Sequence, residues 1–205
     1  MKTTIKTTAL RAATLCATDK KDHRTYLRDI LLDFRHGVVN RVRIVATDGA
    51  ILFAGQHALE YSEDAQTADF KLLLPIDAVK LALKGAGKNA YITLESLPDG
   101  RYALGDTLFS TLSAGTFPSY ERVIPDQNAK VSDVPLQFDA DLMKRGQDAL
   151  RAFYDNKEKF YLTHLDDLGS VMHAGSSEAV VVIMPLRDSA FAWCNSDKYQ
   201  GFYSV

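Results

Sequence analysis

The chain has 205 residues, 46% of them hydrophobic and 24% charged, with a formal net charge of −2 at pH 7. This length can form one large domain or two smaller ones around a substantial core. The charge excludes a protein that is basic over its whole surface, although it permits a local basic face. No apolar run approaches the ~20 residues of a membrane span, and the N-terminal residues contain no signal-peptide core. Cys16 and Cys194 have no paired spacing, which favours reduced thiols and a cytoplasmic location.

The first 60 residues predict a strand, a helix and three further strands. β-Branched residues dominate the first strand, and Thr8 is a candidate N-cap for a helix that continues to Thr18. Asp48-Gly49 is typical of a tight hairpin turn, because Gly accepts a positive φ. The expected strands are 3–7, 25–35, 41–47 and 50–54, and the expected helix is 8–18.

The same order of elements recurs twice. The second occurrence has strand 70–74, helix 76–83 ended by Gly85 and Gly87, and strands 90–97, 101–104 and 107–113. The third has strand 136–138, helix 140–153, and strands 159–163, 170–173 and 179–186. A pattern that repeats at a period of about 55 residues indicates repeated structural units. The predicted fold class is therefore α+β, with three β-α-β-β-β modules.

The segment 115–125 (Gly-Thr-Phe-Pro-Ser-Tyr-Glu-Arg-Val-Ile-Pro) is expected to be a rigid linker between two bodies. Its two prolines stop any helix or central strand, yet Phe117, Tyr120, Val123 and Ile124 are too apolar for a solvated tether. The expected division of the chain is domain 1–125 (modules 1–60 and 66–115 plus linker 115–125), half domain 126–187 and an aromatic tail 188–205. The tail is expected either to pack on its own sheet or to insert as an arm into a neighbouring molecule or into a binding groove of the chain.

The sequence offers no convincing catalytic or metal site. The histidines are scattered without ligand spacing, and the paired aspartates fit a turn and a helix N-terminus. Gly85-Ala-Gly87-Lys88 follows a helix and lacks the spacing of a phosphate-binding loop. We therefore expect neither an enzyme nor a cofactor.

Basic residues occur on or beside all three expected helices. Lys80, Lys84 and Lys88 have i, i+4, i+8 spacing and would project from one side of a helix. The alternatives are an ordinary solvated helix face and a cationic strip that contacts nucleic-acid phosphates without reading sequence. The candidate DNA-facing residues are Arg11, Lys20, Lys21, Arg24, Lys80, Lys84, Lys88, Lys144, Arg145 and Arg151.

Three motifs resemble the bacterial DNA polymerase III β subunit, the replicative sliding clamp. They are Val45-Ala-Thr-Asp-Gly49, Gly115-x-Phe-Pro-x-Tyr-x-Arg-Val-Ile-Pro125 and Val182-Ile-Met-Pro-Leu-Arg187, and they occur in that family's order. The resemblance covers residues 5–187. It implies a DNA-clamp-like fold, in which the first two modules correspond to the clamp's complete middle domain and the third to the second half of its last domain.

The resemblance also implies roles for two sets of residues. Helices line the hole of a clamp, so the basic residues would make loose contact with duplex DNA. A hydrophobic groove between the middle and last domains captures short peptides of polymerases and other replication proteins. Its counterparts here would be Leu27, Thr47, Gly49, Leu52, Pro118, Arg122, Val123, Val182, Ile183, Met184, Pro185 and Leu186. The other interpretation is that these residues only pack the seam between domains. The family's usual His-Arg pair after Asp48-Gly49 is replaced by Ala50 and Ile51.

These observations predict a truncated, sliding-clamp-like replication accessory protein. We expect it to bind clamp-binding peptides, to form a homodimer through residues 134–187 and, if it assembles, to encircle or line duplex DNA through weak, non-specific contacts. The alternative is a regulator that competes for clamp clients, or joins a host clamp, without holding DNA.

Overall fold

The computed structural model describes residues 1–18, 24, 27–37, 39–59, 69–87, 89–111, 117–125, 129–131, 138–155, 159–165, 169–174, 176 and 178–186. Its elements are β1 (Lys2–Lys6), α1 (Thr7–Cys16), β2 (Asp29–Arg35), β3 (Arg41–Thr47), β4 (Ile51–Ala58), β5 (Phe70–Pro75), α2 (Ile76–Ala86), β6 (Tyr91–Ser96), β7 (Tyr102–Leu104), β8 (Thr107–Phe109), a 3₁₀ helix (Tyr120–Arg122), α3 (Ala140–Tyr154), β9 (Phe160–Leu165), β10 (Gly169–Ala174) and β11 (Ala179–Ile183). The expected order of elements is complete in the first two modules, and the described part of the third begins with its helix.

The strands form two antiparallel sheets, and the first two modules exchange their first strands between these sheets. One sheet has four strands in the order β1-β6-β7-β8, and the other has seven in the order β5-β2-β3-β4-β11-β10-β9. β1 therefore pairs with the second module, and β5 pairs with the first. β4 pairs with β11 through Ile51↔Ile183 and Ala179↔Gly55. The larger sheet thus continues from the expected domain 1–125 into the half domain 126–187.

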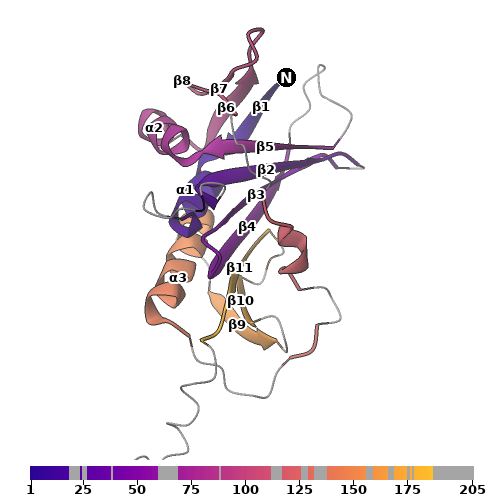
Figure 1. The fold of residues 1–205 in the computed structure, drawn as a ribbon, viewed down its shortest axis with the longest axis vertical. Coiled ribbons are helices and arrows are strands. Elements are labelled where there is room, and N and C mark those ends of the chain that lie inside the picture. Colours follow the sequence, from indigo (N-terminus) through magenta and orange to yellow (C-terminus); the bar gives the residue numbers. More distant parts are fainter. Residues whose placement is uncertain are drawn as a thin grey trace, which may run out of the picture.

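All three helices lie on one side of the seven-stranded sheet (Figure 1). Alternate side chains of the central strands point toward them, which gives the main core its apolar contacts. In α3, Gly146 allows close packing, because an added Cβ would lie 3.1 Å from Ile183 Cδ1. This face joins the third module to the first, since α3 contacts α1 and β4.

The opposite face of the sheet carries a second, smaller core that includes the linker. Phe117 and Tyr120 are buried there against Leu31, Val45 and Val182. The 3₁₀ helix of the linker lies on this side of the sheet (Figure 1). Because its central strands are covered on both faces, they are apolar on consecutive residues.

Two expected helix boundaries are wrong. α1 begins at Thr7 directly after β1, with Lys6 as its N-cap and no side-chain cap, so Thr8 has no capping role. α2 continues through Gly85, and the helix stops only before Gly87, whose φ is 59°. A positive φ is readily adopted by Gly, and it redirects the chain away from the helix.

Several expected strands are shorter in the structure. β2 begins only at Asp29, because Leu27 lies in a tight turn. β8 ends at Phe109, and Phe138 lies outside any strand, while residues 112–113 and 136–137 lie outside the described residues. β11 ends at Ile183, two residues before Pro185, which has no N–H for a sheet ladder.

The expected aromatic tail 188–205 lies outside the described residues, so its packing stays a prediction. Among the helices that the structure describes, none is long and apolar enough to cross a membrane.

Candidate functional site

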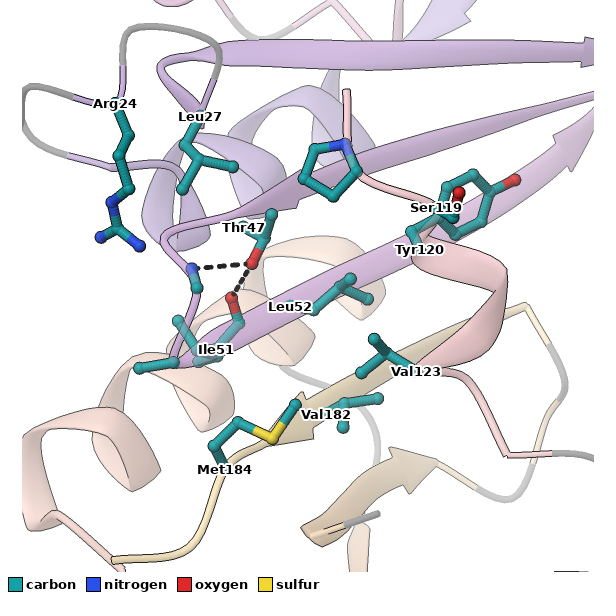
Figure 2. Close-up of a pocket in the computed structure, with 13 residues that line it drawn as sticks. Arg24, Leu27, Thr47, Ile51, Leu52, Ser119, Tyr120, Val123, Val182 and Met184 are labelled. Carbon is teal, nitrogen blue, oxygen red and sulfur yellow. Dashed lines mark hydrogen bonds between the residues drawn. The ribbon is translucent and has the colours of Figure 1, made fainter. Parts of the chain in front are cut away.

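A pocket of 260 Å³ lies between the linker and one end of the seven-stranded sheet. Segments far apart in the sequence form it, namely the approach to β2, the β3–β4 turn, the linker and the end of β11 (Figure 2). Its walls are largely apolar. The lining residues are Arg24, Leu27, Thr47, Gly49, Ala50, Ile51, Leu52, Pro118, Ser119, Tyr120, Val123, Val182 and Met184.

The β3–β4 turn forms a rigid wall of this pocket. Thr47 Oγ1 donates to the Ile51 carbonyl at 2.8 Å and accepts from the Gly49 N–H at 3.0 Å, as Figure 2 shows. Asp48 Oδ1 accepts from the N–H groups of Ala50 and Ile51 at 2.8 and 3.0 Å. Gly49 has a φ of 92°, a conformation that side chains other than Gly rarely adopt. The side chains of Thr47 and Asp48 therefore hold the backbone of this turn in place.

The linker wall is anchored to the sheet by a buried polar contact. The hydroxyl of Tyr120 donates to the carboxylate of Asp33, which is only 1% exposed. Arg35 Nη2 lies 2.7 Å from the same carboxylate and 3.1 Å from Glu121. Burial, and then the contact with Asp33, raise the pKa of Tyr120, so the phenol remains a donor at neutral pH. Lys71 of β5 also pairs with Glu121, at 3.2 Å. These contacts hold the 3₁₀ helix against the sheet.

The structure brings together most of the groove residues that the sequence proposed. Leu27, Thr47, Gly49, Leu52, Pro118, Val123, Val182 and Met184 all line the pocket. Met184 stays beside the turn because its N–H donates to the Ala50 carbonyl at 2.9 Å.

Four proposed groove residues lie elsewhere. Ile183 is fully buried on the helix side of the sheet, because it alternates with Val182 along β11. Arg122 and Leu186 are exposed and Pro185 is half-buried, and none of the three lines the pocket.

Sequence reasoning missed several residues of the pocket. Ala50, Ile51 and Ser119 are next in sequence to residues that were proposed for the groove, so this proximity could have indicated them. Tyr120 was assigned only to packing of the seam. Arg24 was assigned to the DNA-facing set, but its side chain lines the pocket, and Nη2 donates to the Asp48 carbonyl at 2.9 Å.

The other proposed DNA-facing residues have varied surroundings. Lys80 and Lys84 are exposed on α2, whereas Arg11 donates to the Gly87 carbonyl. Arg145 Nη1 pairs with Asp48 Oδ2 at 2.7 Å, and its Nε donates to the Leu15 carbonyl. On α3, Asp148 pairs with both Lys144 and Arg151. Lys20, Lys21 and Lys88 lie outside the described residues.

The described residues provide little for redox or metal chemistry. Cys16 is buried, and burial raises its pKa to about 12, so its thiol is a poor nucleophile. Within the ranges that the structure describes, no group of three or more His, Cys, Asp or Glu side chains could hold a metal ion.

Comparison with solved structures identifies the architecture. The chain is similar to the DNA polymerase III subunit beta of Pseudomonas aeruginosa, with a TM-score of 0.63 and 18% identity over 92% of this chain and 66% of that one. It has a DNA-clamp-like fold. No family model and no curated protein matches the sequence.

Two further structures with this clamp fold are similar. The sliding clamp of Bartonella birtlesii, bound to griselimycin, gives a TM-score of 0.63 and 20% identity over 91% of this chain and 66% of that one. The Helicobacter pylori β clamp bound to a DNA ligase peptide gives 0.64 and 15%, over 90% of this chain and 65% of that one. The chain thus spans about two thirds of the length of these clamps.

Proposed function

We propose that this protein is a sliding-clamp-like replication accessory protein whose pocket binds short peptides of polymerases and other replication proteins. The observation that carries the proposal is the apolar pocket between Leu52, Val123 and Met184, whose walls are held by the Thr47–Ile51 hydrogen bonds and by the Tyr120–Asp33 contact. The related Helicobacter pylori clamp, which was solved with a DNA ligase peptide, supports the same kind of partner.

The size of the pocket suits a pair of side chains better than a folded domain. Its 260 Å³ is slightly below the range of roughly 300–1,000 Å³ found for small-ligand sites. Burial of two large apolar side chains contributes about 3–6 kcal/mol before the costs of association. Micromolar affinity corresponds to about 8 kcal/mol, so the polar contacts of the peptide must supply the remainder.

Fluorescence anisotropy with a labelled peptide tests this proposal. The peptide carries a Gln and a C-terminal Leu-Phe pair, and Met184→Asp should abolish its binding, because a carboxylate would be placed in the apolar pocket. Leu81→Asp is the matched control, since Leu81 is 60% exposed on α2 and does not line the pocket. No binding at high micromolar concentration, or equal binding by both variants, would contradict the proposal.

We also propose weak, sequence-independent contact between the helices and duplex DNA. Lys80 and Lys84 are exposed on one side of α2, where they can reach phosphates. Binding of the wild type to a DNA duplex should weaken as salt rises, and reversal of both to Glu should remove it. The alternative function is a regulator that captures clamp clients without DNA. It is favoured by Asp148, because its ion pairs with Lys144 and Arg151 reduce the positive charge that α3 could present to DNA. Wild-type protein that captures peptide but no DNA at low salt would support that alternative.

A homodimer through residues 134–187 completes the proposal. β9 is the last strand of the larger sheet among the described residues, with a single bridge from Leu165 to Val131, and it carries Tyr161 and Leu162, which are 58% and 38% exposed. An apolar strand at a sheet edge is a surface that proteins usually pair or cover, and a second copy offers a matching strand. Light scattering should therefore give twice the chain mass. Tyr161→Lys should shift the protein toward the monomer, and a monomeric wild type at high micromolar concentration would exclude this assembly.

A further inference from the structure

The chain leaves the pocket of Figure 2 from the pocket's own wall. Met184 lines the pocket, and its N–H donates to the Ala50 carbonyl at 2.9 Å, so the end of β11 is held against the β3–β4 turn. Leu186 is the last described residue, and it is 50% exposed. Two residues span at most about 7 Å, so the segment that follows Leu186 begins beside the pocket.

The sequence beyond Leu186 contains a short stretch with the chemistry that the pocket suits. Gln200 is followed, after one glycine, by the adjacent aromatic residues Phe202 and Tyr203. The peptide expected for the pocket likewise combines a Gln with a pair of large apolar side chains. The segment 187–205 lies outside the described residues.

The walls of the pocket favour an aromatic occupant. Leu52, Val123 and Val182 offer apolar surface, and Figure 2 shows their side chains lining the pocket together with that of Met184. A thioether is polarisable and makes favourable contacts with aromatic rings. Met184 is 38% exposed, so an aromatic side chain placed on it would remove apolar surface from water.

The length of chain between the pocket and Gln200 is sufficient for a return to the pocket. Residues 187–199 span at most about 43 Å, whereas the distance to cover is only the width of a pocket whose wall includes Met184. A ligand on a short tether has an effective concentration on the order of 1 mM. A segment with an intrinsic Kd of about 100 µM would therefore occupy the pocket in about nine of ten molecules.

We propose that Gln200–Tyr203 is a ligand of the pocket in the same chain and competes there with peptides of partner proteins. This inference rests on the proposed peptide binding, and it names an intrachain ligand that regulates the same site. A partner peptide has to displace the tail, which lowers its apparent affinity by a factor of about ten at such an effective concentration. The tail thus sets a threshold that weakly binding apolar sequences do not exceed.

The test uses two full-length variants and the labelled Gln and Leu-Phe peptide. The tail variant combines Phe202→Ser with Tyr203→Ser. The control variant combines Phe191→Ser with Trp193→Ser, which also removes two aromatic side chains from the tail but leaves Gln200–Tyr203 intact. The Kd of the peptide is measured for the wild type and for both variants at several protein concentrations.

We expect the tail variant to bind the peptide on the order of tenfold more tightly than the wild type, and the control variant to bind it like the wild type. The ratio should not change with protein concentration, because the competing segment belongs to the same chain. An unlabelled peptide of residues 198–205 should displace the labelled peptide from the tail variant.

Equal affinity of the wild type and the tail variant, or an equal gain in the control variant, would overturn the role of Gln200–Tyr203 while peptide binding stands. A ratio that grows with protein concentration would assign the tail to the pocket of a second copy and overturn the intrachain contact. Failure of the tail variant to bind the labelled peptide would overturn peptide binding itself, and this inference with it, because Phe202 and Tyr203 no longer compete in that variant.

Discussion

Tyr120→Phe removes one hydroxyl from the contact that anchors the linker to the sheet. Tyr120 is 1% exposed, and its hydroxyl donates to Asp33, whose side chain is equally buried. The substitution keeps the ring and its apolar contacts, so any change in stability reports the hydrogen bond. Because the pKa of Tyr120 is raised, the hydroxyl is protonated throughout the neutral range.

The magnitude follows from the partners that Asp33 retains. A hydrogen bond to a charged group contributes about 1.5–3 kcal/mol, and a buried acceptor that loses its donor incurs a desolvation cost. Arg35 Nη2 remains 2.7 Å from the carboxylate, so Asp33 is not left without a partner. We therefore expect the free energy of unfolding to fall by about 1.5–2 kcal/mol, near the lower end of that range.

Urea denaturation followed by circular dichroism measures this difference. Tyr161→Phe is the control, because Tyr161 is 58% exposed and its variant should stay within about 0.5 kcal/mol of the wild type. A lower transition midpoint at an unchanged slope identifies a loss of stability. If Tyr120→Phe and Tyr161→Phe unfold at the same midpoint, the Tyr120–Asp33 contact does not stabilise the fold and the reasoning is refuted.

Other substitutions test the packing and the buried titratable groups. Gly55→Ala should destabilise the protein by about 1–3 kcal/mol, because the new Cβ would lie 2.7–2.8 Å from two phenylalanine rings. Gly85→Ala should instead stabilise it by about 0.5–1 kcal/mol, because Gly85 lies on α2 and a Cβ added there has no atom within 4 Å. Thermal unfolding of the two variants should therefore shift in opposite directions. His57 is buried, and burial lowers its pKa, so the unfolded state binds more protons than the folded state as the pH falls below 6.5. The free energy of unfolding of the wild type should therefore decrease from pH 7 toward pH 5, and it should decrease less steeply in His57→Gln. Parallel pH profiles of the two proteins would contradict this. In a Cys194→Ser background, Cys16 should resist a thiol reagent at pH 8 in the folded protein and react after unfolding, and rapid labelling of the folded protein would disprove the burial of Cys16.

Much of the fold was predictable because its signals are local. The Asp48-Gly49 turn and the three helices depend on short-range patterns, and the structure confirms each of them. The exchange of β1 and β5 between sheets was not predictable, because no local pattern in a strand specifies which strand it pairs with. Pairing of β4 with β11 likewise depends on tertiary packing across more than a hundred residues.

The candidate site was partly predictable for the same reason. The motif residues Thr47, Gly49 and Val182 do converge at the pocket. The inclusion of Ile183 could have been avoided, since consecutive residues of a strand point to opposite faces. Arg24 could not have been placed there, because its position depends on the chain path between α1 and β2, which no periodic pattern in this segment specifies.

The most direct test of peptide capture is chemical-shift mapping on isotope-labelled protein. Titration with the Gln and Leu-Phe peptide should shift backbone amide signals of residues 47–52, 119–123 and 182–184, because these segments carry most of the pocket lining. Signals of β6, on the other sheet, should remain unchanged. Shifts confined to residues outside the pocket, or no shifts at saturating peptide, would contradict the proposal that this seam is a peptide-binding site.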